Sequence, residues 1–188
     1  RAKLQSKGLS TLVGDEGGFG PNVQSNREYL NLLRETIQDS PWTGLYGSQI
    51  SFSLDEAFSE HLVDSEANEP LVTELSDQPL YWLEGEVDAD GHPQPAALSD
   101  GVTTVGVVRA VTRERHGAPF TGPALVLTSE EWTTYQRDLI AQYPIVSIED
   151  GYDQNDFHGH QSLTTYANAA STVGSPEYEA LPFAIQRE

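Results

Sequence analysis

The chain has 188 residues, enough for one domain with a substantial core, and 37% of them are hydrophobic. It contains no cysteine, which excludes a disulfide framework and a zinc–thiolate site. The 29 acidic and 10 basic residues give a formal net charge of −19, which argues against nucleic acid or anionic lipid as a partner.

No apolar run is long enough to span a membrane, and no signal-peptide pattern is present, so we expect a cytoplasmic protein without a membrane span. Lysine occurs only at Lys3 and Lys7. An acid-rich, lysine-poor surface suits a cytoplasm of high salt concentration, because screening relieves the repulsion between like charges. Ordinary acidic bias is the alternative explanation.

The first element with chemical interest is a glycine-rich turn over residues 14–22, which follows the apolar pair Leu12 and Val13 and contains Glu16. Glycines permit positive φ angles and close backbone approach, so Glu16 is a candidate for an acid held rigidly beside a ligand. A flexible acidic loop is the alternative. The phosphate-binding pattern GxxxxGK[ST] is absent.

A helix and a strand are predicted next. Ser25 followed by Glu28 has the spacing of a capping box, and apolar residues recur at helical spacing until Pro41 marks the exit. Residues 50–54 then alternate with period two and end at Asp55, which predicts a strand with an acid at its carboxyl end. Residues 57–61 fit a short helical turn.

The middle of the chain is less regular. Residues 81–87 predict a strand that enters a turn at 88–91, and a calcium loop is disfavoured there because the glutamate at its twelfth position is missing. Residues 92–123 are punctuated by proline and glycine around one apolar run. We interpret them as an inserted hairpin or a surface excursion, with the nearby arginines, Arg113 among them, in solvated positions.

A second capping box, Thr128 with Glu131, predicts a helix that leads into the apolar run 145–148. That run predicts a buried parallel strand ending at Glu149, which is a ligand or catalyst in one interpretation and a solvated acid in the other. A polar loop follows, then a short helix over 162–170. His158 and His160 are spaced as metal ligands on an extended segment, but surface histidines in a loop are the favoured interpretation.

Three apolar, strand-like segments thus end near an acid, at Glu16, Asp55 and Glu149. In a (β/α) barrel the carboxyl ends of the parallel strands meet at one face, so the three acids are predicted to cluster. Carboxylates held close together need a neutralising cation or proton, and oxygen ligands without cysteine favour Mg²⁺ over zinc.

These stretches resemble the enolase family. Residues 13–22 resemble its glycine-rich catalytic loop, residues 53–60 the strand with its first metal ligand, and residues 127–131 and 143–150 its next helix and the strand with its second ligand. The resemblance implies a partial TIM-type (β/α) barrel, the C-terminal domain of the family, over residues 1–188 with an atypical insert at about 92–123. It also implies a homo-oligomer for the full-length protein.

The resemblance further implies a glycolytic hydro-lyase that interconverts 2-phosphoglycerate and phosphoenolpyruvate with Mg²⁺. Glu16 would be the general acid that assists loss of the 3-hydroxyl group. Asp55 and Glu149 would bind the Mg²⁺ that holds the substrate carboxylate, which makes Glu149 a substrate-binding residue as well.

The chain also departs from the family pattern. The Asp-Pro that follows the second ligand is Asp150-Gly151 here, and the usual tryptophan further on is Phe157. No counterpart of the third metal-binding aspartate is recognised, and no lysine follows Lys7 to serve as the base. We therefore expect a central fragment of an enolase that is incomplete by itself. The alternatives are a non-catalytic enolase-like binding module and another member of the superfamily.

Overall fold

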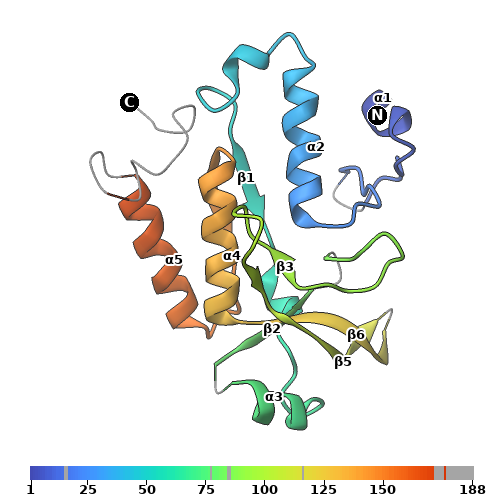
Figure 1. Ribbon diagram of the computed structural model, residues 1–188, viewed down its shortest axis with the longest axis vertical. Helices are drawn as coiled ribbons and strands as arrows, with labels where there is room; N and C mark the ends of the chain where they lie inside the picture. Colours follow the sequence, from blue (N-terminus) through green and yellow to red (C-terminus); the bar gives the residue numbers. More distant parts are fainter. Residues whose placement is uncertain (15–16, 77, 84–85, 116, 172–175, 177–188) are drawn as a thin grey trace.

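The computed structural model describes residues 1–14, 17–76, 78–83, 86–115, 117–171 and 176. It is a mixed α/β structure in which three longer helices, α2 (Asn26–Gln38), α4 (Ser129–Gln142) and α5 (Phe157–Ala170), stand side by side with α4 in the middle (Figure 1). Shorter helices are α1 (Ala2–Ser6), α3 (Glu69–Leu75), η1 (Thr43–Leu45) and η2 (Phe58–His61). No helix in the described ranges is both long and apolar enough to cross a membrane.

Both predicted helix starts are confirmed. The Ser25 hydroxyl accepts a hydrogen bond from the amide of Glu28 and caps α2, while the Glu28 carboxylate accepts from the amide of Gln24. At α4 the capping box is complete, because Thr128 and Glu131 each accept a hydrogen bond from the other's backbone. These contacts satisfy amides that the first turn of a helix leaves without partners.

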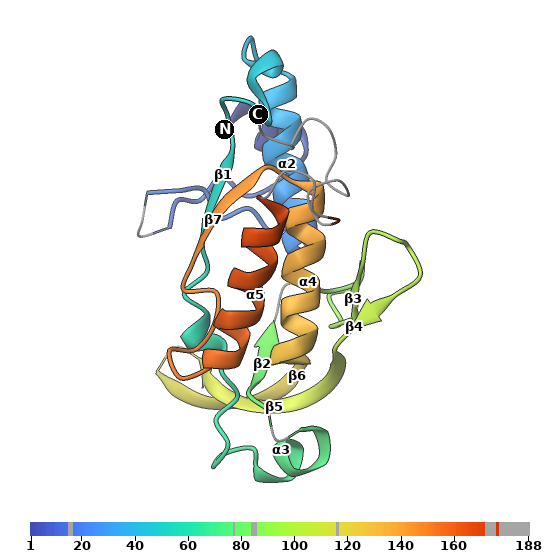
Figure 2. The same ribbon diagram turned by 90° about the vertical axis from the view of Figure 1, so that its left-hand side faces the viewer.

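The predicted parallel strands are β1 (Phe52–Asp55) and β7 (Ile145–Glu149), which pair with each other (Figure 2). In the chain, β1 and β7 are separated by residues 56–128 and by α4. The pair therefore forms a strand–helix–strand crossover, the unit of a (β/α) barrel. The prediction that β7 is buried is wrong in degree, because Val146 is 45% exposed. At the paired positions the side chains of Ser53 and Ser147 are exposed, whereas those of Leu54 and Ile148, on the opposite face, are half-buried.

The second sheet is antiparallel, in the order β2 (Leu80–Leu83), β6 (Ala118–Thr128), β5 (Val107–Arg115). A small hairpin of β3 (Ala96–Ala97) and β4 (Thr104–Val105) lies between β2 and β5 in the chain. The main core joins both sheets to α2 and α4, and its fully buried members include Tyr81, Leu125, Leu127 and Trp132. This core fixes α4 against the strands and thereby places the ends of β1 and β7.

Candidate functional site at the ends of two parallel strands

Asp55 and Glu149 are direct neighbours across the β1–β7 pair, each as the last residue of its strand. Two residues earlier, Ser53 and Ser147 are also register partners, and their hydroxyl oxygens are 2.6 Å apart. That hydrogen bond places the two serines on one face of the sheet. Because side chains alternate between faces with period two, both carboxylates lie on this same face, and both are exposed.

The backbone continues the pairing beyond the strand ends. The amide of Glu56 donates to the carbonyl of Glu149 at 3.0 Å, and the amide of Phe58 donates to the carbonyl of Asp150 at 2.8 Å. Ala57 and Asp150 adopt left-handed conformations, with φ of 44° and 49°. Such conformations are costly for residues other than glycine and cluster at functional sites, so the two turns that leave the strands are tightly determined by their surroundings.

Side chains of helix α4 contact both turns. The indole nitrogen of Trp132 donates to the carbonyl of Gly151 at 2.8 Å, and the same ring stacks on Phe58 with centroids 4.1 Å apart. Gln136 donates both to Gly151 and to the carboxylate of Glu56, at 3.3 and 2.7 Å. A Cβ atom at position 151 would lie 2.9 Å from a side-chain carbon of Ile148 and 3.0 Å from the side-chain nitrogen of Gln136, so a larger residue there requires these side chains to shift.

Glu56 is a third carboxylate beside the pair that the sequence reasoning missed. Burial raises its pKa to about 7, against the lowering effect of the hydrogen bond from Gln136. Glu56 follows Asp55 directly in the sequence. The two adjacent acids at the end of a predicted strand were the signal that could have identified Glu56 as a candidate. Its side chain is directed towards α4 and Gln136 rather than to the exposed face.

The third predicted acid, Glu16, lies outside the described residues. The residues around it form a tight turn, in which the amide of Gly20 donates to the carbonyl of Leu12 and the amide of Gly14 to that of Gly18. The expected strand before Glu16 is wrong, because Leu12 and Val13 are 78% and 54% exposed and Val13 makes only an isolated bridge to Phe19. The structure therefore brings Asp55 and Glu149 together and leaves the placement of Glu16 as a prediction.

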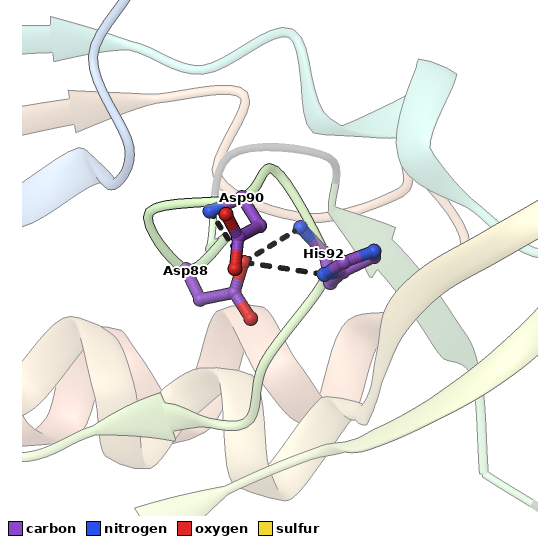
Figure 3. Close-up of side chains that lie close together, drawn as sticks. All are labelled: Asp88, Asp90 and His92. Atoms are coloured by element: carbon purple, nitrogen blue, oxygen red, sulfur yellow. Dashed lines mark hydrogen bonds and ion pairs between the residues drawn. The ribbon is translucent and has the colours of Figure 1, made fainter.

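A separate group of possible metal ligands, Asp88, Asp90 and His92, occurs on an exposed turn (Figure 3). One oxygen of Asp88 accepts hydrogen bonds from the amides of Asp90 and His92, and the other accepts from Gln94. These bonds, with Gly91 at a φ of 83°, make the turn that the sequence predicted. The Asp88 carboxylate is thus used to close its own turn, and we assign no metal to it.

The histidine prediction needs correction. His158 and His160 lie in the first turn of α5, which begins at Phe157 rather than at 162, so neither is in a loop. The ring of His160 packs edge-on against Tyr152, with centroids 5.2 Å apart. Asp156 caps the helix by accepting from the amide of Gly159, and this cap places the histidines within the helix.

Arg113 also differs from expectation. Its guanidinium group lies over the rings of Trp82 and Phe120, at 4.7 and 5.0 Å from their centroids, and donates to the carbonyls of Val111 and Gly122. It is therefore a packed part of the antiparallel sheet rather than a solvated charge. Arg109, in contrast, forms an exposed ion pair with Glu74.

Comparison with known protein families gives one match that spans most of the chain. The family model for the enolase C-terminal TIM barrel domain matches residues 1–86 and 118–175. The matched ranges contain Asp55 and Glu149. They leave out residues 87–117, which hold β3, β4 and all of β5.

Proposed function

Because the chain belongs to the enolase C-terminal TIM barrel domain family, we propose that it is part of a Mg²⁺-dependent phosphopyruvate hydratase that interconverts 2-phosphoglycerate and phosphoenolpyruvate. The observation that supports this proposal most directly is the pairing of Asp55 with Glu149 at the carboxyl ends of adjacent parallel strands. In barrel enzymes this end of the strands carries the chemistry.

The two carboxylates suit Mg²⁺ by their chemistry. They offer hard oxygen ligands from neighbouring strands on one open face, and Mg²⁺ commonly binds through one or two carboxylates together with water and substrate oxygens. Among the described residues, the ion pairs formed by lysine, arginine and histidine involve neither carboxylate. The negative charge of the pair is therefore available to a cation.

In this proposal Asp55 and Glu149 hold the metal, and Glu149 also lies against the bound substrate. When bound, Mg²⁺ supplies the positive charge that neutralises an enolate, as in enolase superfamily enzymes generally. Glu16 is the proposed general acid for the departing hydroxyl group. The chain has no lysine after Lys7, so the base that removes the C2 proton of the substrate is not assigned to a residue of this sequence. A third metal ligand is not assigned either, because no counterpart of the family's aspartate is recognised.

The remaining properties are proposed on the same basis. We place the protein in the cytoplasm and in glycolysis, as a homo-oligomer in its full-length form. We treat residues 1–188 as one partial barrel domain with an atypical insert at about 92–123.

The test is titration of the purified chain with MgCl₂ by isothermal calorimetry, with Asp55→Ala and Glu149→Ala as variants. Asp64→Ala, which removes an exposed acid from a loop, is the matched control. We expect one site that both strand-end substitutions abolish and the control keeps. Binding that is indifferent to Asp55 and Glu149 would refute the metal site and favour a non-catalytic, enolase-like binding module.

A further inference from the structure

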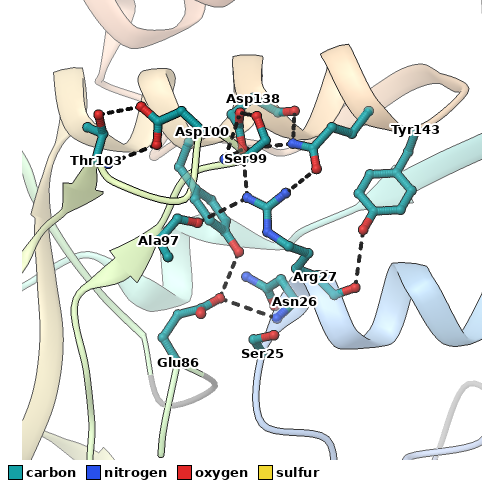
Figure 4. A network of polar contacts seen from close by, with 12 residues as sticks. Ser25, Asn26, Arg27, Glu86, Ala97, Ser99, Asp100, Thr103, Asp138 and Tyr143 are labelled. Carbon is teal, nitrogen blue, oxygen red and sulfur yellow. Dashed lines mark hydrogen bonds and ion pairs between the residues drawn. The ribbon is translucent and has the colours of Figure 1, made fainter. Parts of the chain in front are cut away.

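Residues 87–105, which we call the excursion, connect two parts of the candidate enzyme that are distant in sequence. At one end the amide of Val87 binds the carbonyl of Gln24, between the glycine-rich loop and α2. At the other end the excursion is fixed to α4, where Ser99 binds Asp138 (Figure 4). The match to the family model does not include these residues.

The attachment to α4 is strong. The carboxylate of Asp138 accepts hydrogen bonds from the amide and the hydroxyl of Ser99, and it pairs with Arg27 at 2.6 Å. Arg27 also donates to the carbonyl of Ala97 at 3.2 Å. Ala96 and Val105, at 0% and 7% exposure, belong to the main core. The hairpin of the excursion is therefore anchored by burial as well as by charge.

The other end of the excursion reaches Gln24, four residues after Gly20. The amide of Val87 donates to the carbonyl of Gln24 at 2.9 Å, and the Gln24 side chain reaches the carbonyl of Asp88 at 3.4 Å. Immediately before Val87, the Glu86 carboxylate accepts from the amide of Asn26 and from the hydroxyl of Tyr135 on α4. The start of α2 is thus tied through Glu86 to the helix that supports Asp55 and Glu149.

The bond from Val87 to Gln24 can be removed without disturbing the turn of the excursion. Val87 faces Pro93 across that turn, but the two bonds that close the ladder run from Asp88 to His92 and from Gln94 to Glu86. The Val87 amide points the other way, towards Gln24. A proline at position 87 removes this amide hydrogen and keeps the donors of both ladder bonds, but it also restricts the backbone of Glu86, the residue before it.

We propose that Val87 and Glu86 are positioning residues that fix the point where the glycine-rich loop rejoins α2. The contacts of Val87 and Glu86 are observed in the structure. Their effect on catalysis rests on the proposed function, in which the glycine-rich loop supplies the general acid. The excursion then sets the position of the loop relative to the paired carboxylates through α4, and substitutions within it change catalysis without touching substrate.

The test compares Val87→Pro with Val87→Ala in the full chain. Both variants lose the valine methyl groups, but only proline removes the amide hydrogen. Hydrogen–deuterium exchange is followed by mass spectrometry on peptides covering residues 9–24 and, as an internal control, on peptides from α4. We expect exchange in 9–24 to be about fivefold faster in Val87→Pro than in Val87→Ala, the change that about 1 kcal/mol of lost hydrogen bonding produces, with α4 unchanged.

Equal exchange in the two variants, or faster exchange throughout the protein, would overturn the proposal. Magnesium affinity is measured in the same samples and is expected to be unaltered, because Asp55 and Glu149 lie on other elements. Absence of Mg²⁺ binding with a selective change in the 9–24 peptides would refute the proposed function alone. Normal Mg²⁺ binding with no selective change would refute the positioning role alone.

Discussion

Replacing Asp55 with asparagine removes one of two charges that lie side by side at the strand ends. Neighbouring strands are about 4.8 Å apart, and two unit charges at that separation in water repel by about 0.9 kcal/mol before salt screening. The repulsion is present in the folded protein and largely absent from the unfolded chain. Without divalent cations, we therefore expect Asp55→Asn to raise the free energy of unfolding by up to about 0.9 kcal/mol.

Mg²⁺ should reverse this order. If the dissociation constant is on the order of 1 mM, about 10 mM Mg²⁺ raises the unfolding free energy of the unaltered protein by RT ln 11, about 1.4 kcal/mol. The variant lacks one of the two ligands and gains far less. Asp55→Asn then becomes the less stable protein, by about 0.5 kcal/mol, the difference between the two terms.

The assay is urea unfolding followed by tryptophan fluorescence, with and without MgCl₂ at matched ionic strength, and the midpoints are compared at constant slope. Glu66→Gln makes the same change in net charge in an exposed loop, and its effect should be independent of Mg²⁺. If Asp55→Asn stays the more stable protein in Mg²⁺, or if Mg²⁺ stabilises both proteins equally, the paired carboxylates do not bind the cation.

Two further predictions concern the packing around the site. Burial raises the pKa of Glu86 above its ordinary value of 4.5, so the folded protein holds this proton more tightly and loses stability as the pH rises through the folded-state pKa. Urea midpoints of the unaltered protein and Glu86→Gln should agree near pH 4 and separate as the pH rises, with the variant more stable; parallel pH profiles would contradict this. Gly106 has a φ of +79°, and an added Cβ would lie 2.6 Å from Leu125, so Gly106→Ala should lower the unfolding free energy by about 2–5 kcal/mol through strain and overpacking. At Gly117, which has a φ of +77°, an added Cβ would meet nothing within 4 Å. Gly117→Ala should therefore lower the unfolding free energy by only about 1–2 kcal/mol in the same urea assay. Equal losses of stability in the two variants would show that the contact with Leu125 does not add to the cost.

The sequence was informative where the determining interactions are local. Ser25 and Thr128 cap helices through contacts with residues three positions away, so their pattern is readable without tertiary information. The strands that end at Asp55 and Glu149 were also predicted, because apolar runs closed by acids and turn residues are short-range signals. Their meeting at one edge needed the hypothesis of a (β/α) barrel, because apolar patterns predict strands but not which strands are neighbours.

The hairpin expected within residues 92–123 is present as β5 and β6. The sequence did not predict that β6 continues to Thr128 and pairs with β2, because the strands contain residues typical of turns. Pro119 and Pro123 lie within β6, yet β6 pairs with β5 over residues 118–126, a range that includes both prolines. The described pairing of β6 with β2 covers only residues 125–128, so both prolines fall where the second edge of β6 is not bonded to β2. The strand expected before Glu16 was not found. Leu12 and Val13 have the composition of a strand, but among the residues that the structure describes their sheet pairing is limited to the bridge between Val13 and Phe19.

The pairing of β1 with β7 also has a consequence for the order of folding. Ser53 and Ser147 are 94 residues apart in the chain, whereas β5 and β6 meet through a tight turn. Closing a loop of that length costs about 2 kcal/mol more than closing a ten-residue loop, and hairpins form within about 1–10 μs. The hairpin and helices therefore form first, and the two strand ends meet in a late step. A cation that bridges them acts after the transition state, so it should slow unfolding and leave the folding rate nearly unchanged.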